Sequence, residues 1–209
     1  MSFINQYCLI RNRVITHQGK EFYTGQPGTL DNFMEEVYEF LSPAYPKFYK
    51  MDRLSKLGFL ASEIIVKDLQ PLSKYSPEQV AVVLSNSSAS LDTDLRYAES
   101  HKIIPSPALF VYTLPNIVAG EICIRQGIQG ENTFFVTEQF EAKHMTDYVD
   151  LVMASGKTRA CIAGWAEVLG DHHDIFLYLI ENEKGANGLE HTAEQLHKIY
   201  TLNYGRADS

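Results

Sequence analysis

The chain has 209 residues, of which 45% are hydrophobic and 21% are charged, and its formal net charge is −8. This composition suits one globular domain with an ample core. It disfavours a nucleic-acid role, because phosphate binding needs a basic face. No apolar run approaches the roughly 20 residues that span a bilayer, and the N-terminus does not resemble a signal peptide. We therefore expect a cytoplasmic protein with no membrane span.

The first half of the chain predicts a strand region followed by helices. An apolar run at 7–16 predicts one strand, with a turn near Gln18-Gly19 and a short strand at 22–23. Helical periodicity follows at 30–40 and again at 49–68, where apolar residues recur on one stripe. The continuous apolar run 80–84 predicts a strand buried on both faces. A hydroxyl-rich loop then leads into a helix at 91–99.

The second half predicts alternating strands and helices. A largely helical segment at 111–126, with Pro115 near its start, ends at two glycines. It is followed by a strand at 133–136, a helix at 139–154 and strands at 159–168 and 174–181. A possible capping box at Thr192 indicates a last helix. Apolar strands in this alternation predict an α/β sheet with helices on its faces.

Common catalytic and metal patterns are absent, since the sequence has no G-x-G-x-x-G, P-loop, G-x-S-x-G or H-E-x-x-H. We interpret Asp171-His172-His173-Asp174 as a solvated turn between two strands, because adjacent loop residues rarely converge on one ion. His144 lies among polar residues of a predicted helix, which favours a surface position over a general base. The serine-rich loop 85–90 is interpreted as a strand-to-helix loop with capping side chains, and an oxyanion site is the alternative. No metal and no cofactor are predicted.

The three cysteines, Cys8, Cys123 and Cys161, are widely spaced and form no zinc pattern. We expect free thiols in a reducing compartment. Cys161 lies in a predicted buried strand and is expected to behave as a small core side chain.

Several motifs form a series along the chain, namely Lys50-Met51-Asp52-Arg53-Leu54-Ser55, Asn86 to Asp92, Ser106 to Asn116, Gly120-Glu121, Gly127 to Gly130, and Ala163-Gly164-Trp165-Ala166-Glu167. Together they resemble the N-terminal half of β-ketoacyl-acyl-carrier-protein synthases. The likeness spans roughly residues 5 to 182 and depends on the order and spacing of these pieces.

The family's nucleophile position can be placed in this sequence. Family members run from a Gly-Pro through a short strand to a T-A-C elbow, and then through a helix and a strand to A-G-G. Placing Gly130-Glu131 on the Gly-Pro and Ala163-Gly164-Trp165 on the A-G-G needs no gap. The nucleophile position then falls on Gln139, with Thr137 and Glu138 as its neighbours.

A glutamine changes what this elbow can do. In the family the elbow holds a cysteine at a helix N-terminus, where the macrodipole and free N–H groups stabilise a thiolate. The thiolate takes up the acyl chain as a thioester. The amide of Gln139 is a poor nucleophile but can donate and accept hydrogen bonds. We therefore expect no acyl-enzyme at this position.

The resemblance implies a thiolase-like half with an α/β fold, namely a mixed five-stranded sheet with helices packed on its faces. It implies a single domain over residues 1–209 without the second thiolase half that carries the family's catalytic histidines. His191 and His197 lack the family's surrounding motifs and are not assigned those roles. Glu138-Gln139 also resembles the S-E-Q of chain-length factors, the cysteine-less partners of type II polyketide ketosynthases.

Three hypotheses follow for the function. The leading one is a non-condensing, ketosynthase-like subunit in type II fatty-acid or polyketide (aryl-polyene-type) biosynthesis. It would pair with a Cys-bearing ketosynthase and an acyl carrier protein as a homodimer or heterodimer. The second is an enzyme like a malonyl-thioester decarboxylase, in which Gln139 polarises the thioester carbonyl. The third is an acyl-carrier-binding scaffold, in which dimerisation covers a sheet face that the missing half leaves bare.

Overall fold

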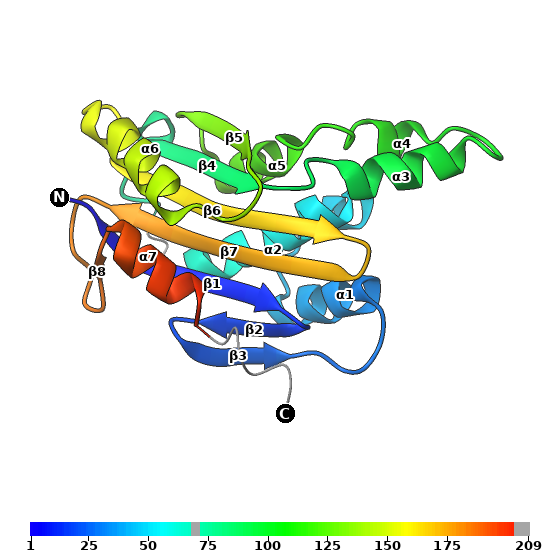
Figure 1. Cartoon of the computed structure of the whole chain (residues 1–209), viewed down its shortest axis with the longest axis horizontal. Helices are drawn as coiled ribbons and strands as arrows, with labels where there is room; N and C mark the ends of the chain where they lie inside the picture. The colour runs from blue at the N-terminus through cyan, green and yellow to red at the C-terminus, as the bar shows by residue number, and fades with distance from the viewer. Residues whose placement is uncertain (68–71, 203–209) are drawn as a thin grey trace.

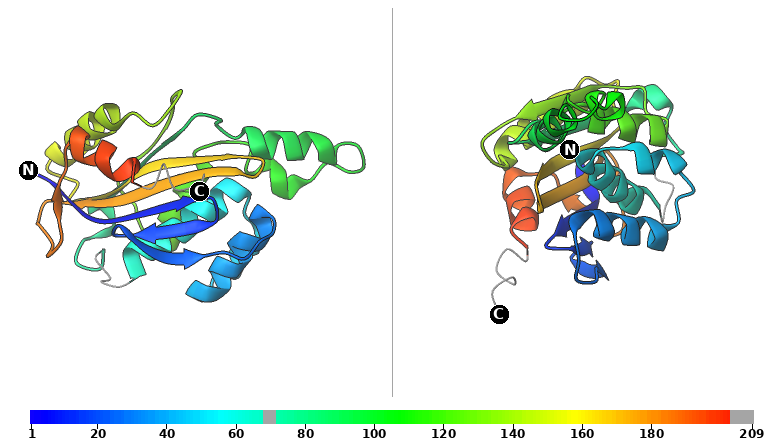
Figure 2. Two further views of the ribbon diagram at one scale, coloured as in Figure 1. Left: turned by 60° about the horizontal axis from the view of Figure 1, so that its bottom comes forward. Right: turned by 90° about the vertical axis from the view of Figure 1, so that its right-hand side faces the viewer.

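A mixed β-sheet lies between two layers of helices in the computed structural model, which describes residues 1–67 and 72–202 (Figures 1 and 2). Strand β7 runs antiparallel to β1 and to β6, whereas β4 and β5 run parallel to β6. This arrangement confirms the predicted α/β fold with a mixed sheet. The strands, in spatial order, are β3 (Lys20–Thr24), β2 (Val14–His17), β1 (Phe3–Arg11), β7 (His172–Glu181), β6 (Ala160–Leu169), β4 (Val80–Asn86) and β5 (Asn132–Val136).

In the described part of the chain, the sheet has eight strands rather than the predicted five. Strands β1, β7, β6, β4 and β5 form a five-stranded unit, which is extended by β2, β3 and β8 (Leu189–Glu190). The strand predicted at 7–16 is a hairpin that turns at Asn12 and Arg13, whose φ angles are 48° and 63°. A two-residue turn with both φ angles positive suits the twist of a hairpin. Arginine gives no sequence indication of such a turn.

Helices cover both faces of the sheet. Helices α1 (Leu30–Leu41), α2 (Arg53–Lys67) and α5 (Ile117–Gln126) contribute to one core cluster, and α6 (Ala142–Ala154) and α7 (Ala193–Tyr200) contribute to the other. The expectation of a bare sheet face is therefore wrong, because α6 and the C-terminal α7 supply its cover. Helices α3 (Leu91–Ser100) and α4 (Pro107–Phe110) extend beyond the sheet (Figure 1).

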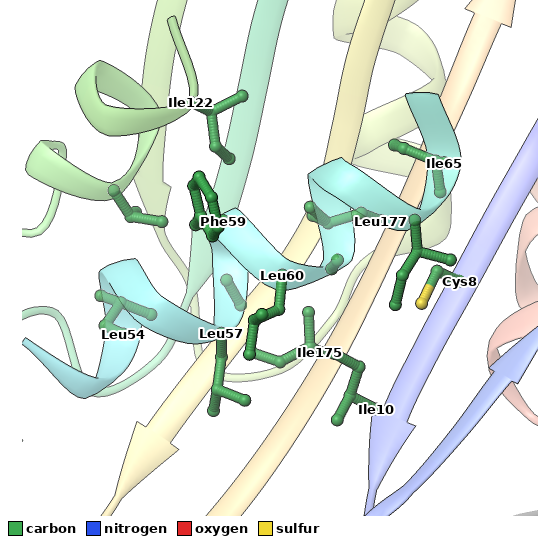
Figure 3. Packing of buried hydrophobic residues seen from close by; sticks show 14 of the residues in the cluster. Cys8, Ile10, Leu54, Leu57, Phe59, Leu60, Ile65, Ile122, Ile175 and Leu177 are labelled. Atoms are coloured by element: carbon green, nitrogen blue, oxygen red, sulfur yellow. The ribbon is translucent and has the colours of Figure 1, made fainter. Parts of the chain in front are cut away.

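The apolar stripe of α2 forms the centre of the first core cluster. Leu57 and Leu60 lie toward Ile175 and Leu177 of β7, as Figure 3 shows. The helix begins at Arg53 rather than at the predicted residue 49, because Pro46–Lys50 form a short 3-10 helix, η1. The predicted last residue, Asp68, lies outside the described residues.

The helical segment predicted at 111–126 is interrupted. The structure has α4 before it and α5 within it, with turns over residues 111–116. Pro115 lies in this interruption, where it cannot donate a helical hydrogen bond. A second short 3-10 helix, η2 (Pro77–Gln79), precedes β4. None of the helices in the described part of the chain has the length and apolar character needed to cross a membrane.

The cysteines agree with the sequence prediction. All three are free thiols, and Cys8 and Cys161 are fully buried. Burial raises the pKa of the Cys123 thiol to about 11 and raises the pKa values of Cys8 and Cys161 further still. Cys161 is thus a core side chain, as predicted.

Candidate functional site

The three predicted site residues lie together in the bend between β5 and α6. The backbone N–H of Thr137 donates to the carbonyl oxygen of Asn86 at 2.9 Å, so the bend is tied to the end of β4. The Thr137 hydroxyl donates to the carbonyl oxygen of Gln139 at 2.9 Å. The side chains of Glu138 and Gln139 are exposed. The bend therefore presents Gln139 at the surface, beside the carboxyl end of a parallel strand pair.

Helix α6 begins later than predicted. Its first residue is Ala142, and Glu141 is the N-cap with extended backbone angles (φ −109°, ψ 92°). The preceding residue, Phe140, is buried, so the chain turns inward before the helix starts. Gln139 therefore stands two residues ahead of the N-cap, where the stabilising effect of the helix dipole on an anion is weaker.

Phe140 anchors the bend on an aromatic cluster, which we define as Phe140, Trp165, Phe176 and Tyr200. The Phe140 ring centroid lies 5.4 Å from that of Phe176, 6.4 Å from that of Trp165 and 4.4 Å from that of Tyr200. Strands β6 and β7 and helix α7 each contribute to the cluster. The position of Gln139 thus depends on segments from the end of the chain as well as on β5.

The serine-rich loop after β4 binds a carboxylate of the chain itself. Oε2 of Glu167 accepts hydrogen bonds from the backbone N–H groups of Ser87 and Ser88, at 2.7 and 3.0 Å, and from the Ser87 hydroxyl at 3.1 Å. Glu167 is buried on β6. The predicted strand-to-helix loop is present, and the N–H groups of Ser87 and Ser88 are satisfied internally. The predicted side-chain capping is wrong, because the N-cap residue Ser90 makes no capping hydrogen bond and its hydroxyl donates to Asp94 and to the Thr113 carbonyl oxygen. Sequence reasoning assigned no role to Glu167, although a glutamate in an apolar strand indicates a buried polar partner.

Asn86 connects this loop to the bend. Its side-chain amide donates to the carbonyl oxygen of Ala89 at 2.8 Å and accepts from the Ala89 N–H at 3.0 Å. These bonds hold Ala89 at a φ of 49°, which is unusual for a residue with a Cβ. Because the Asn86 carbonyl also accepts from Thr137, the serine loop and the bend are positioned by one residue.

The 171–174 segment is only partly the solvated turn that was predicted. The turn falls at Gly170 and Asp171, and the next residues belong to β7. His173 is buried, and its Nε2 accepts from the backbone N–H of Arg13 at 3.1 Å. Asp174 is buried and binds Arg11 and the Tyr200 hydroxyl, each at 2.5 Å. Two of the four residues, His173 and Asp174, are therefore packed within the sheet and are not part of a solvated turn.

Of the other histidines singled out in the sequence, His144 is more buried than predicted, His191 is buried and His197 is exposed. His144 is half-buried, with its ring edge-on to Phe135 at 4.7 Å, and is not a surface residue. His191 is buried and its Nδ1 lies 2.9 Å from Oδ1 of Asp150. Among residues 1–67 and 72–202, no group of three or more His, Cys, Asp or Glu side chains is arranged to hold a metal ion.

Three cavities in the described part of the chain lie away from Gln139. One of about 620 Å³ lies between the segment that precedes β5 and the C-terminal part of α6, and another of about 460 Å³ lies beside His191. A third of about 340 Å³ lies near the end of α5. Gln139 lines none of the three.

No family model matches the sequence, and none of the curated proteins matches it. Solved structures do match the fold. The ishigamide ketosynthase/chain length factor matches with a TM-score of 0.62 and 17% identity, over 87% of this chain and 62% of that one. A beta-ketoacyl synthase from Burkholderia phymatum matches with a TM-score of 0.58 and 13% identity, over 87% of this chain and 59% of that one.

A third match is closer in length. It is a chain of the complex between a ketosynthase (ApeO) and its chain length factor (ApeC) from Xenorhabdus doucetiae, with a TM-score of 0.54 and 11% identity. The match covers 88% of this chain and 81% of that chain, so that chain is only slightly longer. The chain therefore has the thiolase-like fold of ketosynthases and chain length factors. It spans less than two thirds of the length of the other two matched chains.

Proposed function

We propose that this chain is a non-condensing, ketosynthase-like subunit that pairs with a Cys-bearing ketosynthase in type II fatty-acid or polyketide synthesis, of the aryl-polyene type. The observation that carries the proposal is Gln139 in the bend between β5 and α6 of a ketosynthase-type fold. In our alignment this is the nucleophile position, and an amide forms no thioester there. The condensing cysteine would then come from the partner.

The thiols of this chain do not substitute for the missing nucleophile. Cys8 and Cys161 are fully buried on β1 and β6, and Cys123 lies on α5. Burial raises the pKa of each thiol, so at neutral pH almost no thiolate forms. This chain therefore has no reactive cysteine thiolate that could take up an acyl group.

The edges of the sheet favour β5 as the surface that meets the partner. Strand β3 is at one end of the sheet and carries Lys20 and Glu21, which discourage pairing with another chain. Strand β5, at the other end, contains no charged residue and pairs with β4 alone in the described part of the chain. Its last residue, Val136, is 57% exposed. An uncharged, open edge is suited to strand pairing across an interface.

The similar structures support a partnership. Two of them are a ketosynthase with its chain length factor, and another is a type II acyl-carrier protein in complex with its ketosynthase. The Xenorhabdus match extends over most of both chains, which supports a role for a chain of this length in such a pair.

Co-expression with a Cys-bearing ketosynthase from a neighbouring gene tests the proposal. We expect a stable heterodimer at micromolar concentration, measured by size-exclusion chromatography with light scattering. Components that stay separate, or a homodimer that excludes the ketosynthase, would contradict the proposal.

A Val136→Pro substitution tests the β5 edge within that assay. The Thr137 N–H bonds to Asn86 on β4, and strand N–H groups alternate in direction, so the Val136 N–H points away from β4. Proline removes this outward donor without removing a β4–β5 bond. We expect at least about a tenfold weaker complex, which is a difference of about 1.4 kcal/mol. Val136→Thr keeps the N–H and is the matched control. Equal affinity of both variants would rule out pairing through β5.

A further inference from the structure

A row of side chains crosses the sheet directly beneath the bend. Residue pairing places Phe135 of β5 beside Ser85 of β4, Ser85 beside Trp165 of β6, and Trp165 beside Phe176 of β7. Neighbouring residues in register point to the same face of a sheet. That face is the one covered by α6 and α7. Ser85 is the small member of the row, and the indole of Trp165 is the largest side chain in it.

Trp165 fills this position although its burial leaves a polar group without a hydrogen-bond partner. The residue is 3% exposed, and its indole N–H has no hydrogen-bond partner among the described residues. A buried donor without an acceptor destabilises a fold. In the alignment Trp165 stands where the resembling A-G-G pattern has its last glycine, so a side chain occupies space that a glycine would leave open. Bulk, rather than hydrogen bonding, is what this residue contributes.

Tyr200 of α7 closes the same region from the other side. Its ring lies 4.4 Å from that of Phe140 and 5.8 Å from that of Phe176, measured between centroids. Arg11 lies over the Tyr200 ring at 4.4 Å and donates to its carbonyl oxygen at 2.6 Å. The Tyr200 hydroxyl donates to Asp174. The end of α7 is thus fastened over the aromatic cluster.

We propose that Trp165, enclosed by Phe140, Phe176 and Tyr200, is a plug that closes the space beneath Gln139 to acyl chains. This inference rests on the proposed function, since it concerns an acyl group brought to the bend. An alkyl tail at Gln139 then finds no room inside this chain and lies in the partner or between the two chains. Trp165 is a specificity-determining residue in this account, because its size excludes the tail.

A covalent tether at residue 139 tests the plug on the isolated chain. Gln139→Cys is made in a Cys123→Ser background, because the other two thiols are fully buried. The thiolate displaces iodide from iodoacetamide or from N-octyl iodoacetamide, which gives a short or a long thioether adduct. The melting temperature of each adduct is compared with Trp165 in place and with Trp165→Ala. Glu138→Cys, one residue away and also exposed, is the matched control site.

With Trp165 in place we expect the short and long adducts to melt within about 1 °C of each other. With Trp165→Ala we expect the octyl adduct at residue 139 to melt about 4 °C or more above the short adduct, because the tail fills the opened space. Trp165→Leu is the second variant if the alanine variant does not fold. An octyl tail that stabilises the protein equally with Trp165 present, or that never stabilises the smaller variants, overturns the plug. Because no partner is used, a failure of heterodimer formation leaves this result unaffected.

Discussion

At the scale of single residues, Gln139 is held in a position that suits contact better than chemistry. Its side chain is exposed, it precedes the N-cap of α6 by two residues, and its neighbours Glu138 and Glu141 are acidic. Nearby negative charge and distance from the helix end both disfavour an anion there. The bend therefore lacks the electrostatics of a thiolate site as well as the thiol.

We therefore expect that placing a cysteine at residue 139 does not create an acyl-accepting nucleophile. Gln139→Cys should have a thiol pKa at or above the ordinary value of about 8.5, since acidic neighbours raise it. The measurement is the pH dependence of alkylation by iodoacetamide in a Cys123→Ser background. A thiol pKa below about 7, or acyl loading from a carrier protein at neutral pH, would show that the bend still supports nucleophilic catalysis.

Glu167 is the residue on which the serine loop depends most. Glu167→Ala leaves three donors from Ser87 and Ser88 without their acceptor, and we expect a loss of about 3–5 kcal/mol of unfolding free energy. Glu167→Gln keeps an acceptor oxygen and should lose about 1–2 kcal/mol. Urea denaturation measures both variants. Similar losses for the two would mean that the acceptor oxygen itself contributes little.

Sequence reasoning placed Gln139, Thr137 and Glu138 in one turn because a strand and a helix flank them. It gave no role to Glu167, because the three donors that bind this carboxylate lie 79 and 80 residues earlier. Long-range polar pairs leave no local periodicity, so only the three-dimensional structure shows them.

At the scale of elements, the β1–β2 hairpin depends on a histidine from β7. The Nε2 of His173 accepts from the Arg13 N–H in the turn, while Nδ1 lies 2.9 Å from the Asp171 carbonyl oxygen. Burial lowers the pKa of His173 below its ordinary value of 6.5. The folded state therefore favours the neutral ring, in which Nδ1 donates and Nε2 accepts.

The lowered pKa of His173 predicts a loss of stability in mild acid. The unfolded chain takes up a proton near pH 6.5, whereas the folded chain resists protonation until lower pH. The contribution of His173 is therefore complete above pH 6.5 and is lost as the pH falls toward its folded pKa. His173→Gln keeps an acceptor that does not titrate. We expect its unfolding free energy, measured by urea denaturation from pH 7.5 to pH 5, to fall less steeply than that of the native protein.

The elements themselves were predictable to different degrees. The stripe of α2 and the apolar run of β4 followed directly from periodicity and continuity. The hairpin at Asn12 and Arg13 did not, because an arginine in a left-handed conformation has no local preference for it. The contacts from β7, which lie far along the chain, determine that conformation.

At the scale of the whole molecule, the helices α3 and α4 form an arm that extends beyond the sheet (Figure 1). The segment between them is exposed, and it includes Ile103 at 89% and Ile104 at 75% exposure. Sparse packing of this kind allows local opening at low free energy. The arm is the part of the described molecule where we expect the first proteolytic cleavage.

Limited trypsin digestion tests the openness of the arm. We expect the first cut after Lys102, which lies between α3 and α4 with its side chain 70% exposed. Lys102→Gln should delay this first cut about tenfold or more if that bond is the open one. Mass spectrometry of the early fragments is the measurement. A first cut within the sheet strands would show that the sheet opens more easily than the arm, which would contradict the prediction.

The pairing of β1 with β7 has a consequence for how the protein is made. Ile10 pairs with Ile175, so the first strand has its central neighbour only after most of the chain has been synthesised. At a synthesis rate of about 5–20 residues per second, the wait is roughly 8 to 33 seconds. During that time β1 pairs with β2 but lacks its β7 partner. We therefore expect nascent chains of this protein to depend on chaperones that shield the N-terminal hairpin until β7 leaves the ribosome.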